Sequence, residues 1–129
     1  DGVHLAASDP PFPAASRLVG RSCHTDDELD RAGREGASYA TLSPVFASVS
    51  KPGYTPAAAA APLPRLARRP GRPPVLALGG VTTAGVGPCL AAGAWGVAVL
   101  GAVMGALDPG AATSAFLDAL ERAQSEVAP

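Results

Sequence analysis

Residues 75–101, VLALGGVTTAGVGPCLAAGAWGVAVLG, decide the fold class of this chain. An apolar run from Val75 to Leu78 ends in the pair Gly79-Gly80, and a second run, from Gly96 to Leu100, ends in Gly101. The segment between the two runs is long enough for one short helix. Buried parallel strands are typically continuous apolar runs, so the stretch predicts a strand, a helix and a second, parallel strand.

A membrane span is the alternative interpretation, because the sequence from Val75 to Leu107 contains no charged residue. Its glycines and Pro88 divide it into short pieces, however, and no basic or aromatic anchors flank it. Thr82 or Thr83 can also cap a helix that continues to Ala92. We therefore expect a buried strand-helix-strand unit and no membrane association.

Three further apolar runs precede this unit, from Gly2 to Leu5, from Leu18 to Ser22 and from Tyr39 to Ser43. Helix signals separate or follow the runs. The capping box from Thr25 to Glu28 begins one helix, and Gly36 is a plausible end for it. Asp108 precedes a proline and is a good cap for a last helix over residues 110–124, with an apolar face at Ala112, Phe116, Ala119 and Leu120.

Strands that alternate with helices predict an α/β fold with a parallel sheet. A doubly wound sheet and a (β/α)8 barrel both remain possible from this pattern. A closed barrel needs eight strands, so the five strands found here would supply only part of one. We expect a single domain over residues 1–129.

The composition favours a small-molecule partner. The 129 residues include 10 basic and 11 acidic side chains, which offer no broad positive field for nucleic acid or anionic lipid. Cys23 and Cys89 do not form a CxxC or Cys/His cluster, so we expect small buried side chains in a reduced, cytoplasmic protein. Trp95 and Met104 are expected in the core.

Reactive groups of parallel α/β proteins gather where the strands end, so the residues after each strand are the site candidates. These are Asp9, Ser22, His24, the segment 43–53, Gly79-Gly80 and Leu100-Gly101. Asp9 could bind a metal or cap a turn. His4, inside an apolar strand, is expected to be structural.

Lys51 is the only lysine of the chain, and Ser48 and Ser50 lie beside it in sequence. One ammonium and two hydroxyls could hold an anion, although a solvated surface loop has the same composition. Backbone amides at Gly80 and Gly101 could approach a phosphate, as in the last two βα loops of many barrels. Each glycine alone is also typical of an ordinary turn.

Five motifs occur in a specific order and spacing: DGVHL at residues 1–5, GRSCH at 20–24, YATLSPVF at 39–46, ALGGV at 77–81 and AGAWGVAV at 92–99. With Asp9, Glu28 and Ser50-Lys51 between them, the motifs resemble the thiamine phosphate synthases and their close relatives, the thiazole tautomerases. The resemblance covers nearly the whole chain.

The resemblance implies a (β/α)8 barrel of which this chain holds the last five βα units, without the first three strands. It also implies a transferase that joins hydroxymethylpyrimidine diphosphate to thiazole phosphate and releases pyrophosphate, with Mg²⁺ as cofactor. In such enzymes a pyrimidine carbocation is captured by the thiazole nitrogen. An incomplete barrel would expose unpaired strand edges, so we expect the chain alone to be inactive and to associate, for example as a homo-oligomer.

Residue by residue, the resemblance assigns a Mg²⁺-binding carboxylate to Asp9 and pyrophosphate contacts to Ser22 and Lys51. It places Ser48 and Ser50 in contact with the thiazole phosphate or beside it. It places Gly80, Leu100 and Gly101 in the phosphate loops. Those roles suit the chemistry, because expelling a polyanion requires preplaced positive charge and hydrogen-bond donors.

The chain departs from the family pattern at several positions. Ala6-Ala7-Ser8 replaces a usual Gly-Gln pair, Ser48 replaces a more common Thr, and Gly101 stands where Ser is frequent. Two other functions stay open. A thiazole tautomerase typically has His where this chain has Pro44, which argues against that isomerase, and the third possibility is a non-catalytic partial barrel that binds a phosphate ligand or a partner chain.

Overall fold

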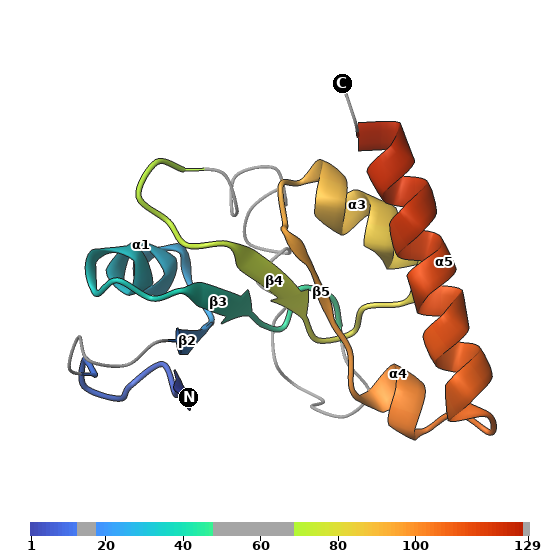
Figure 1. Ribbon diagram of the computed structural model, residues 1–129, viewed down its shortest axis with the longest axis horizontal. Helices are drawn as coiled ribbons and strands as arrows, with labels where there is room; N and C mark the ends of the chain where they lie inside the picture. Colours follow the sequence, from blue (N-terminus) through green and yellow to red (C-terminus); the bar gives the residue numbers. More distant parts are fainter. Residues whose placement is uncertain (13–17, 48–68, 128–129) are drawn as a thin grey trace.

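Strands and helices alternate along the chain in the computed structural model, which describes residues 1–12, 18–47 and 69–127 (Figure 1). The elements, in order, are β1 (Gly2–Leu5), β2 (Leu18–Cys23), α1 (Asp26–Arg34), β3 (Tyr39–Leu42), β4 (Val75–Leu78), the 3-10 turn η2 (Thr83–Gly85), α3 (Val86–Ala91), β5 (Gly96–Ala98), α4 (Gly101–Met104) and α5 (Pro109–Val127).

The five strands form one sheet in the order β1-β2-β3-β4-β5, and every pairing is parallel. The predicted α/β class and all five strands are confirmed. The last strand is shorter than expected, because β5 ends at Ala98 and Leu100 instead lies directly before α4. Among the described strands, β1 and β5 each pair along one edge only.

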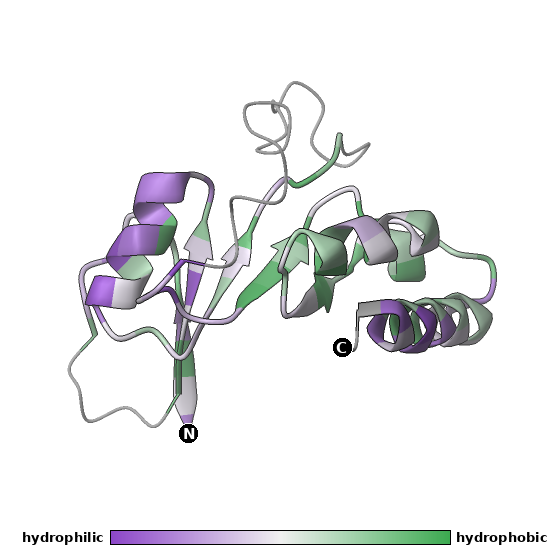
Figure 2. Cartoon of the chain, turned by 90° about the horizontal axis from the view of Figure 1, so that it is seen from above, coloured by the Kyte–Doolittle hydropathy of each residue, from purple (hydrophilic) through white to green (hydrophobic). Residues whose placement is uncertain are grey.

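One face of the sheet is covered by helices. Side chains alternate along a strand, and the buried members that point to this face pack against α1 and α3. That cluster contains Cys23, Leu29, Ala32, Ala40, Leu42, Val45, Val75, Ala77 and Cys89. A second cluster joins α3 to α5 through Val81, Val86, Leu90, Phe116, Ala119 and Ala123. The residues of α1 are largely hydrophilic, whereas those of β4 are largely hydrophobic (Figure 2).

The opposite face is more open. Leu18 points to it and is 51% exposed, and His4 is also exposed. Tyr39 and Ser22 are partly buried there. A parallel sheet normally has both faces covered, whereas none of the described helices covers this face.

The caps predicted for α1 and α5 are confirmed, whereas the predicted Thr82 or Thr83 cap is not: Thr82 precedes η2 without a side-chain cap hydrogen bond, and Gly85 is the N-cap of α3. The Thr25 hydroxyl accepts a hydrogen bond from the Glu28 backbone N–H at 3.2 Å, and the Glu28 carboxylate accepts one from the His24 backbone N–H. Gly36 follows α1 with a φ of 74°. Asp108 caps α5 by accepting the N–H of Ala111 at 2.9 Å.

Buried Arg72 fixes α1 from the chain segment before β4. Its guanidinium forms ion pairs with Asp26 at 3.0 Å and with Asp30 at 2.6 Å. The hydrogen bond from Arg72 lowers the pKa of Asp30 below its ordinary value of 3.8. The stability contributed by the ionised Asp30 carboxylate is therefore present above about pH 4 and is lost as the pH falls through the lowered pKa of Asp30.

Two expectations about the core differ from the structure, and one agrees. Cys23 and Cys89 are fully buried, and burial raises the pKa of each thiol to about 11, so they are inert hydrophobic side chains. Trp95 and Met104 are 73% and 72% exposed, so their expected place in the core is wrong. Trp95 directly precedes edge strand β5, and Met104 ends the short helix α4, where no described element covers either side chain.

The uncharged stretch from Val75 to Leu107 forms β4, α3, β5 and α4. No helix within the described ranges combines the length and the apolar character needed to cross a membrane.

Candidate functional site

The carboxyl ends of all five strands lie along one edge of the sheet, because every strand is parallel to its neighbours. This edge carries the loop at residues 6–9 after β1, His24 after β2, residues 43–47 after β3, Gly79-Gly80 after β4 and Leu100-Gly101 after β5. Ser22 lies within the last two residues of β2. The structure thus brings the described site candidates to one edge, whereas Ser48, Ser50 and Lys51 lie outside the described residues.

Asp9 closes the loop that follows β1. Its carboxylate Oδ2 accepts a hydrogen bond from the Ala6 backbone N–H at 2.7 Å, and its own N–H donates to the Ala6 carbonyl at 3.2 Å. The contacts of Asp9 are therefore those of a residue that caps a turn, one of the two roles that the sequence left open. Within the described part of the chain, no group of three or more His, Cys, Asp or Glu side chains could hold a metal ion.

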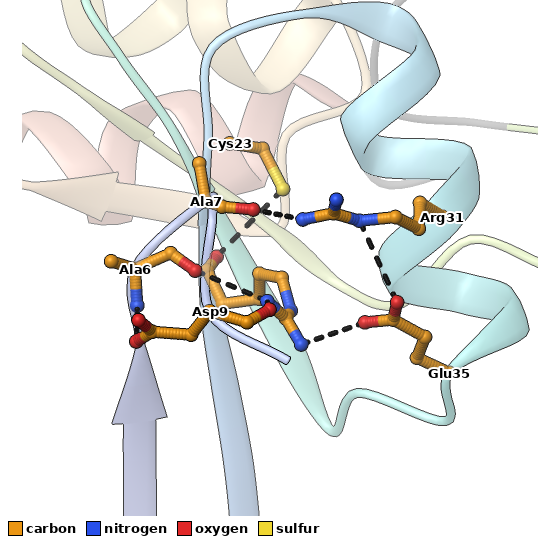
Figure 3. Close-up of polar contacts among 7 residues, drawn as sticks. Ala6, Ala7, Asp9, Cys23, Arg31 and Glu35 are labelled. Carbon is orange, nitrogen blue, oxygen red and sulfur yellow. Dashed lines mark hydrogen bonds and ion pairs between the residues drawn. The ribbon is translucent and has the colours of Figure 1, made fainter. Parts of the chain in front are cut away.

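Two arginines hold the same loop from the helix-covered side of the sheet (Figure 3). Arg21 Nη1 donates to the carbonyls of Ala6 and Asp9, at 3.1 and 2.8 Å. Arg31 donates to the Ala7 carbonyl. Glu35 pairs with Arg21 at 2.7 Å and with Arg31 at 3.6 Å, so its carboxylate joins both arginines. Sequence reasoning missed this network, for which the only signal was a charged residue in the middle of an apolar strand.

Ser22 belongs to a hydrogen-bonded chain on the open face of the sheet. Its hydroxyl lies 2.9 Å from His4 Nε2, and His4 Nδ1 lies 2.9 Å from the Tyr39 hydroxyl. The three side chains come from β2, β1 and β3. His4 has the structural role that the sequence suggested, but it is a polar link next to a site residue rather than a core side chain. Tyr39 was not among the sequence candidates.

His24 connects the ends of β2 and β3. Its Nδ1 lies 2.7 Å from the Ser43 carbonyl oxygen, and its backbone N–H is capped by Glu28. The first contact links two strand ends and the second is local, and both are structural, as expected for a turn residue.

Gly79 and Gly80 join the loop after β4 to the loop after β3. The Val45 N–H donates to the Leu78 carbonyl at 2.9 Å, and the Phe46 N–H donates to the Gly79 carbonyl at 3.0 Å. Both glycines have a positive φ, of 88° and 67°. A Cβ on Gly80 would lie 2.5 Å from the Ala47 carbonyl oxygen. Ala47, the last described residue before the Ser48–Lys51 segment, is therefore packed directly against Gly80.

Leu100 and Gly101 lie at the corresponding place after β5, where Leu100 precedes α4 and Gly101 is its first residue. Leu100 is 70% exposed, and its carbonyl accepts the N–H groups of Val103 at 3.1 Å and Met104 at 2.8 Å. A Cβ added to Gly101 would meet no atom within 4 Å. Packing among the described residues therefore does not require glycine at position 101, and a serine would fit there.

Gly79→Ala is expected to destabilise the fold by about 2 kcal/mol, because the backbone at Gly79 is left-handed, a conformation that a side chain disfavours, and a Cβ would lie 2.8 Å from Pro44 Cα. Gly101→Ala is the matched control and should change the free energy of unfolding by less than about 0.5 kcal/mol. Urea unfolding of both variants measures the difference. Equal stabilities would show that the packing of the two loops does not depend on Gly79.

Comparisons with known proteins place these features in a family. The profile of the family described as thiamine monophosphate synthase matches residues 1–103. The thiamine-phosphate synthase of Methanoculleus marisnigri is 41% identical over 132 residues, which cover 98% of this chain and 62% of the relative. That of Roseiflexus castenholzii is 40% identical over 124 residues, covering 92% and 54%. The chain thus spans about half to three fifths of these two relatives.

Solved structures give the same result for the fold. Thiamine phosphate pyrophosphorylase from Pyrococcus furiosus superposes with a TM-score of 0.77 and 28% identity, over 95% of this chain and 60% of that chain. A 3-hexulose-6-phosphate synthase superposes with a TM-score of 0.68 at 22% identity, which shows likeness of fold alone. The parallel sheet with its helices is accordingly part of a (β/α)8 barrel.

Proposed function

The chain belongs to the thiamine monophosphate synthase family, and from this premise we propose that it carries the phosphate-binding portion of a thiamine phosphate synthase. The enzyme would condense hydroxymethylpyrimidine diphosphate with thiazole phosphate, giving thiamine phosphate and pyrophosphate. The observation that carries this proposal is the gathering of Ser22, Gly80 and Gly101 along one edge of the sheet, together with the packing of Ala47, the residue before Ser48 in sequence, against Gly80.

The proposed roles follow from the charge of the leaving group. Pyrophosphate leaves as a polyanion, so the groups around it must be hydrogen-bond donors or cations held in place before the reaction. The Ser22 hydroxyl and the Lys51 ammonium would contact the pyrophosphate. Ser48, Ser50 and the backbone amides near Gly80, Leu100 and Gly101 would hold the thiazole phosphate.

Mg²⁺ is the proposed cofactor, and Asp9 is the described residue that would bind it. Oδ2 of Asp9 accepts the Ala6 N–H, and among the described residues the second carboxylate oxygen has no hydrogen-bond donor, so it could bind a cation. One or two carboxylates together with substrate phosphates are a usual Mg²⁺ environment, so a single aspartate fits such a site. Bound there, the cation would neutralise charge on the departing pyrophosphate. Arg21 would keep Asp9 in place through the Asp9 carbonyl.

Three further βα units are proposed to complete the barrel by pairing with the free edges of β1 and β5. They would cover the open face that carries Leu18 and supply the remaining substrate contacts. Where the units are not supplied, a second copy of the chain could occupy the same edges as a homo-oligomer. A cytoplasmic location agrees with the two buried, free thiols.

An activity assay tests the proposed function. The amino-terminal barrel units of the Methanoculleus marisnigri synthase would be fused before Asp1, and the fusion incubated with both substrates and Mg²⁺. Formation of thiamine phosphate with equimolar pyrophosphate is the expected result. A folded fusion that binds both substrates but forms no product would contradict the synthase assignment. Conversion of a thiazole carboxylate phosphate tautomer by the same fusion would instead support the tautomerase.

A further inference from the structure

The hydrogen-bonded chain of Tyr39, His4 and Ser22 runs across three adjacent strands on the open face. His4 of β1 lies opposite Gly20 of β2, and Gly20 lies opposite Tyr39 of β3. Ser22 follows Gly20 by two residues, so it points to the same face one step closer to the carboxyl edge. The hydrogen bonds among these three side chains therefore lead from the middle of the sheet to the edge that carries the proposed anion site.

Gly20 makes this arrangement possible. His4 and Tyr39 belong to strands that are not neighbours, and a side chain on the strand between them would normally separate them. A Cβ at Gly20 would overlap with His4 Nδ1 and with the Tyr39 ring. Because glycine occupies the position, the two rings approach each other across β2, with centroids 5.5 Å apart.

The donors in this chain have a preferred direction. A neutral imidazole has one N–H and one acceptor nitrogen, so only one hydroxyl can donate to His4. A phenolic hydroxyl is a stronger acid than an aliphatic one, and therefore the stronger donor. Tyr39 then donates to Nδ1, the proton resides on Nε2, and Nε2–H donates to the Ser22 oxygen. The single proton of Ser22 is left free to donate elsewhere.

We propose that Tyr39 and His4 are positioning residues that fix the direction of the Ser22 hydroxyl, so that its proton points at a bound pyrophosphate or phosphate group. An anion can accept a hydrogen bond from Ser22 only if the serine proton is not already donated to histidine. The opposite tautomer, with the proton on Nδ1, would draw the serine proton to Nε2 and turn a lone pair toward the anion. The identity of the anion rests on the proposed function, whereas the direction of the hydrogen bonds from Tyr39 through His4 to Ser22 does not.

Nitrogen-15 spectroscopy of the imidazoles tests the direction in the intact chain. The sequence contains only two histidines, so His24 serves as an internal reference in the same spectrum. At mildly alkaline pH without ligand, His4 should show a protonated Nε2 and an unprotonated Nδ1. A protonated Nδ1 on His4, or a mixture of tautomers, would overturn the inference.

Tyr39→Phe removes the donor and keeps the ring. The His4 signal should then change to a mixture of tautomers while His24 is unaffected, and inorganic pyrophosphate with Mg²⁺ should bind about tenfold more weakly. Gly20→Ala, which separates the same two rings, should give the same spectral change. Unchanged His4 nitrogens in Tyr39→Phe would contradict the positioning role.

The outcomes separate this inference from the proposed function. If the wild-type protein shows the expected His4 tautomer but binds no pyrophosphate, the hydrogen-bond direction is supported and pyrophosphate is excluded as the ligand of Ser22. A chain that binds pyrophosphate with His4 in the opposite tautomer would support the function and overturn the inference.

Discussion

Replacing Lys51 by alanine is expected to lower the rate of thiamine phosphate formation by a factor on the order of 10²–10³, the usual effect of removing one electrostatic donor to developing charge. Lys51 is the only ammonium side chain in the sequence, so no other lysine could substitute for it. Its segment begins directly after Ala47, whose carbonyl is packed against Gly80. The described loop that precedes this segment therefore adjoins the proposed phosphate amides.

The barrel fusion described above is the suitable background, with pyrophosphate release as the readout. Lys51→Arg keeps the positive charge but replaces the compact ammonium with a planar guanidinium. Because the charge remains, this variant should retain more activity than Lys51→Ala. Similar losses in both variants would indicate a geometric requirement. Turnover within about twofold of the unsubstituted fusion for Lys51→Ala would remove the lysine from the mechanism.

Arg21→Met should lower the free energy of unfolding by about 3 kcal/mol, the low end of the range for breaking a buried ion pair. Arg21 is 1% exposed, and its loss leaves the Glu35 carboxylate and the carbonyls of Ala6 and Asp9 without this donor. Glu35 is 19% exposed on its side chain and still faces Arg31, which limits the cost.

Arg122→Met on the exposed surface of α5 is the matched control and should change stability by less than about 0.5 kcal/mol. Urea unfolding of the two variants gives the comparison. The barrel fusion with Arg21→Met should in addition need more Mg²⁺ for half-maximal activity, because the loop that carries Asp9 is no longer held. A loss below about 1 kcal/mol would mean that the network around Arg21 is not a main support of the loop.

Most of the fold could be predicted because its signals are local. Apolar runs ending in glycine located β4 and β5, and the hydroxyl and carboxylate of Thr25 and Glu28 located the start of α1. The short β5 was less predictable, since the length of an edge strand depends on pairing with a partner. The exposure of Trp95 could not be predicted from the sequence. A hydrophobic side chain favours burial, but it is buried only where neighbouring elements cover it.

The site was predictable where chain order suffices. Parallel strands bring Asp9, Ser22, Gly80 and Gly101 to one edge whatever their exact packing. The contacts of Arg21 and the chain from Tyr39 to Ser22 depend on strand register, which a single sequence does not specify. Gly20 could have been a clue, since a glycine inside a strand often marks a close approach of other groups.

Binding of inorganic pyrophosphate with Mg²⁺, followed through the backbone amide resonances of the chain, tests the central claim most directly. The claim is that the anionic groups of both substrates bind along the carboxyl edge of the sheet. Pyrophosphate should shift the amide of Ser22, and thiazole phosphate added to it should shift those of Gly80 and Gly101 along one binding curve, while the amides of α1 and the outer face of α5 stay unchanged. Shifts confined to a helix surface, or separate curves for Gly80 and Gly101, would contradict the claim.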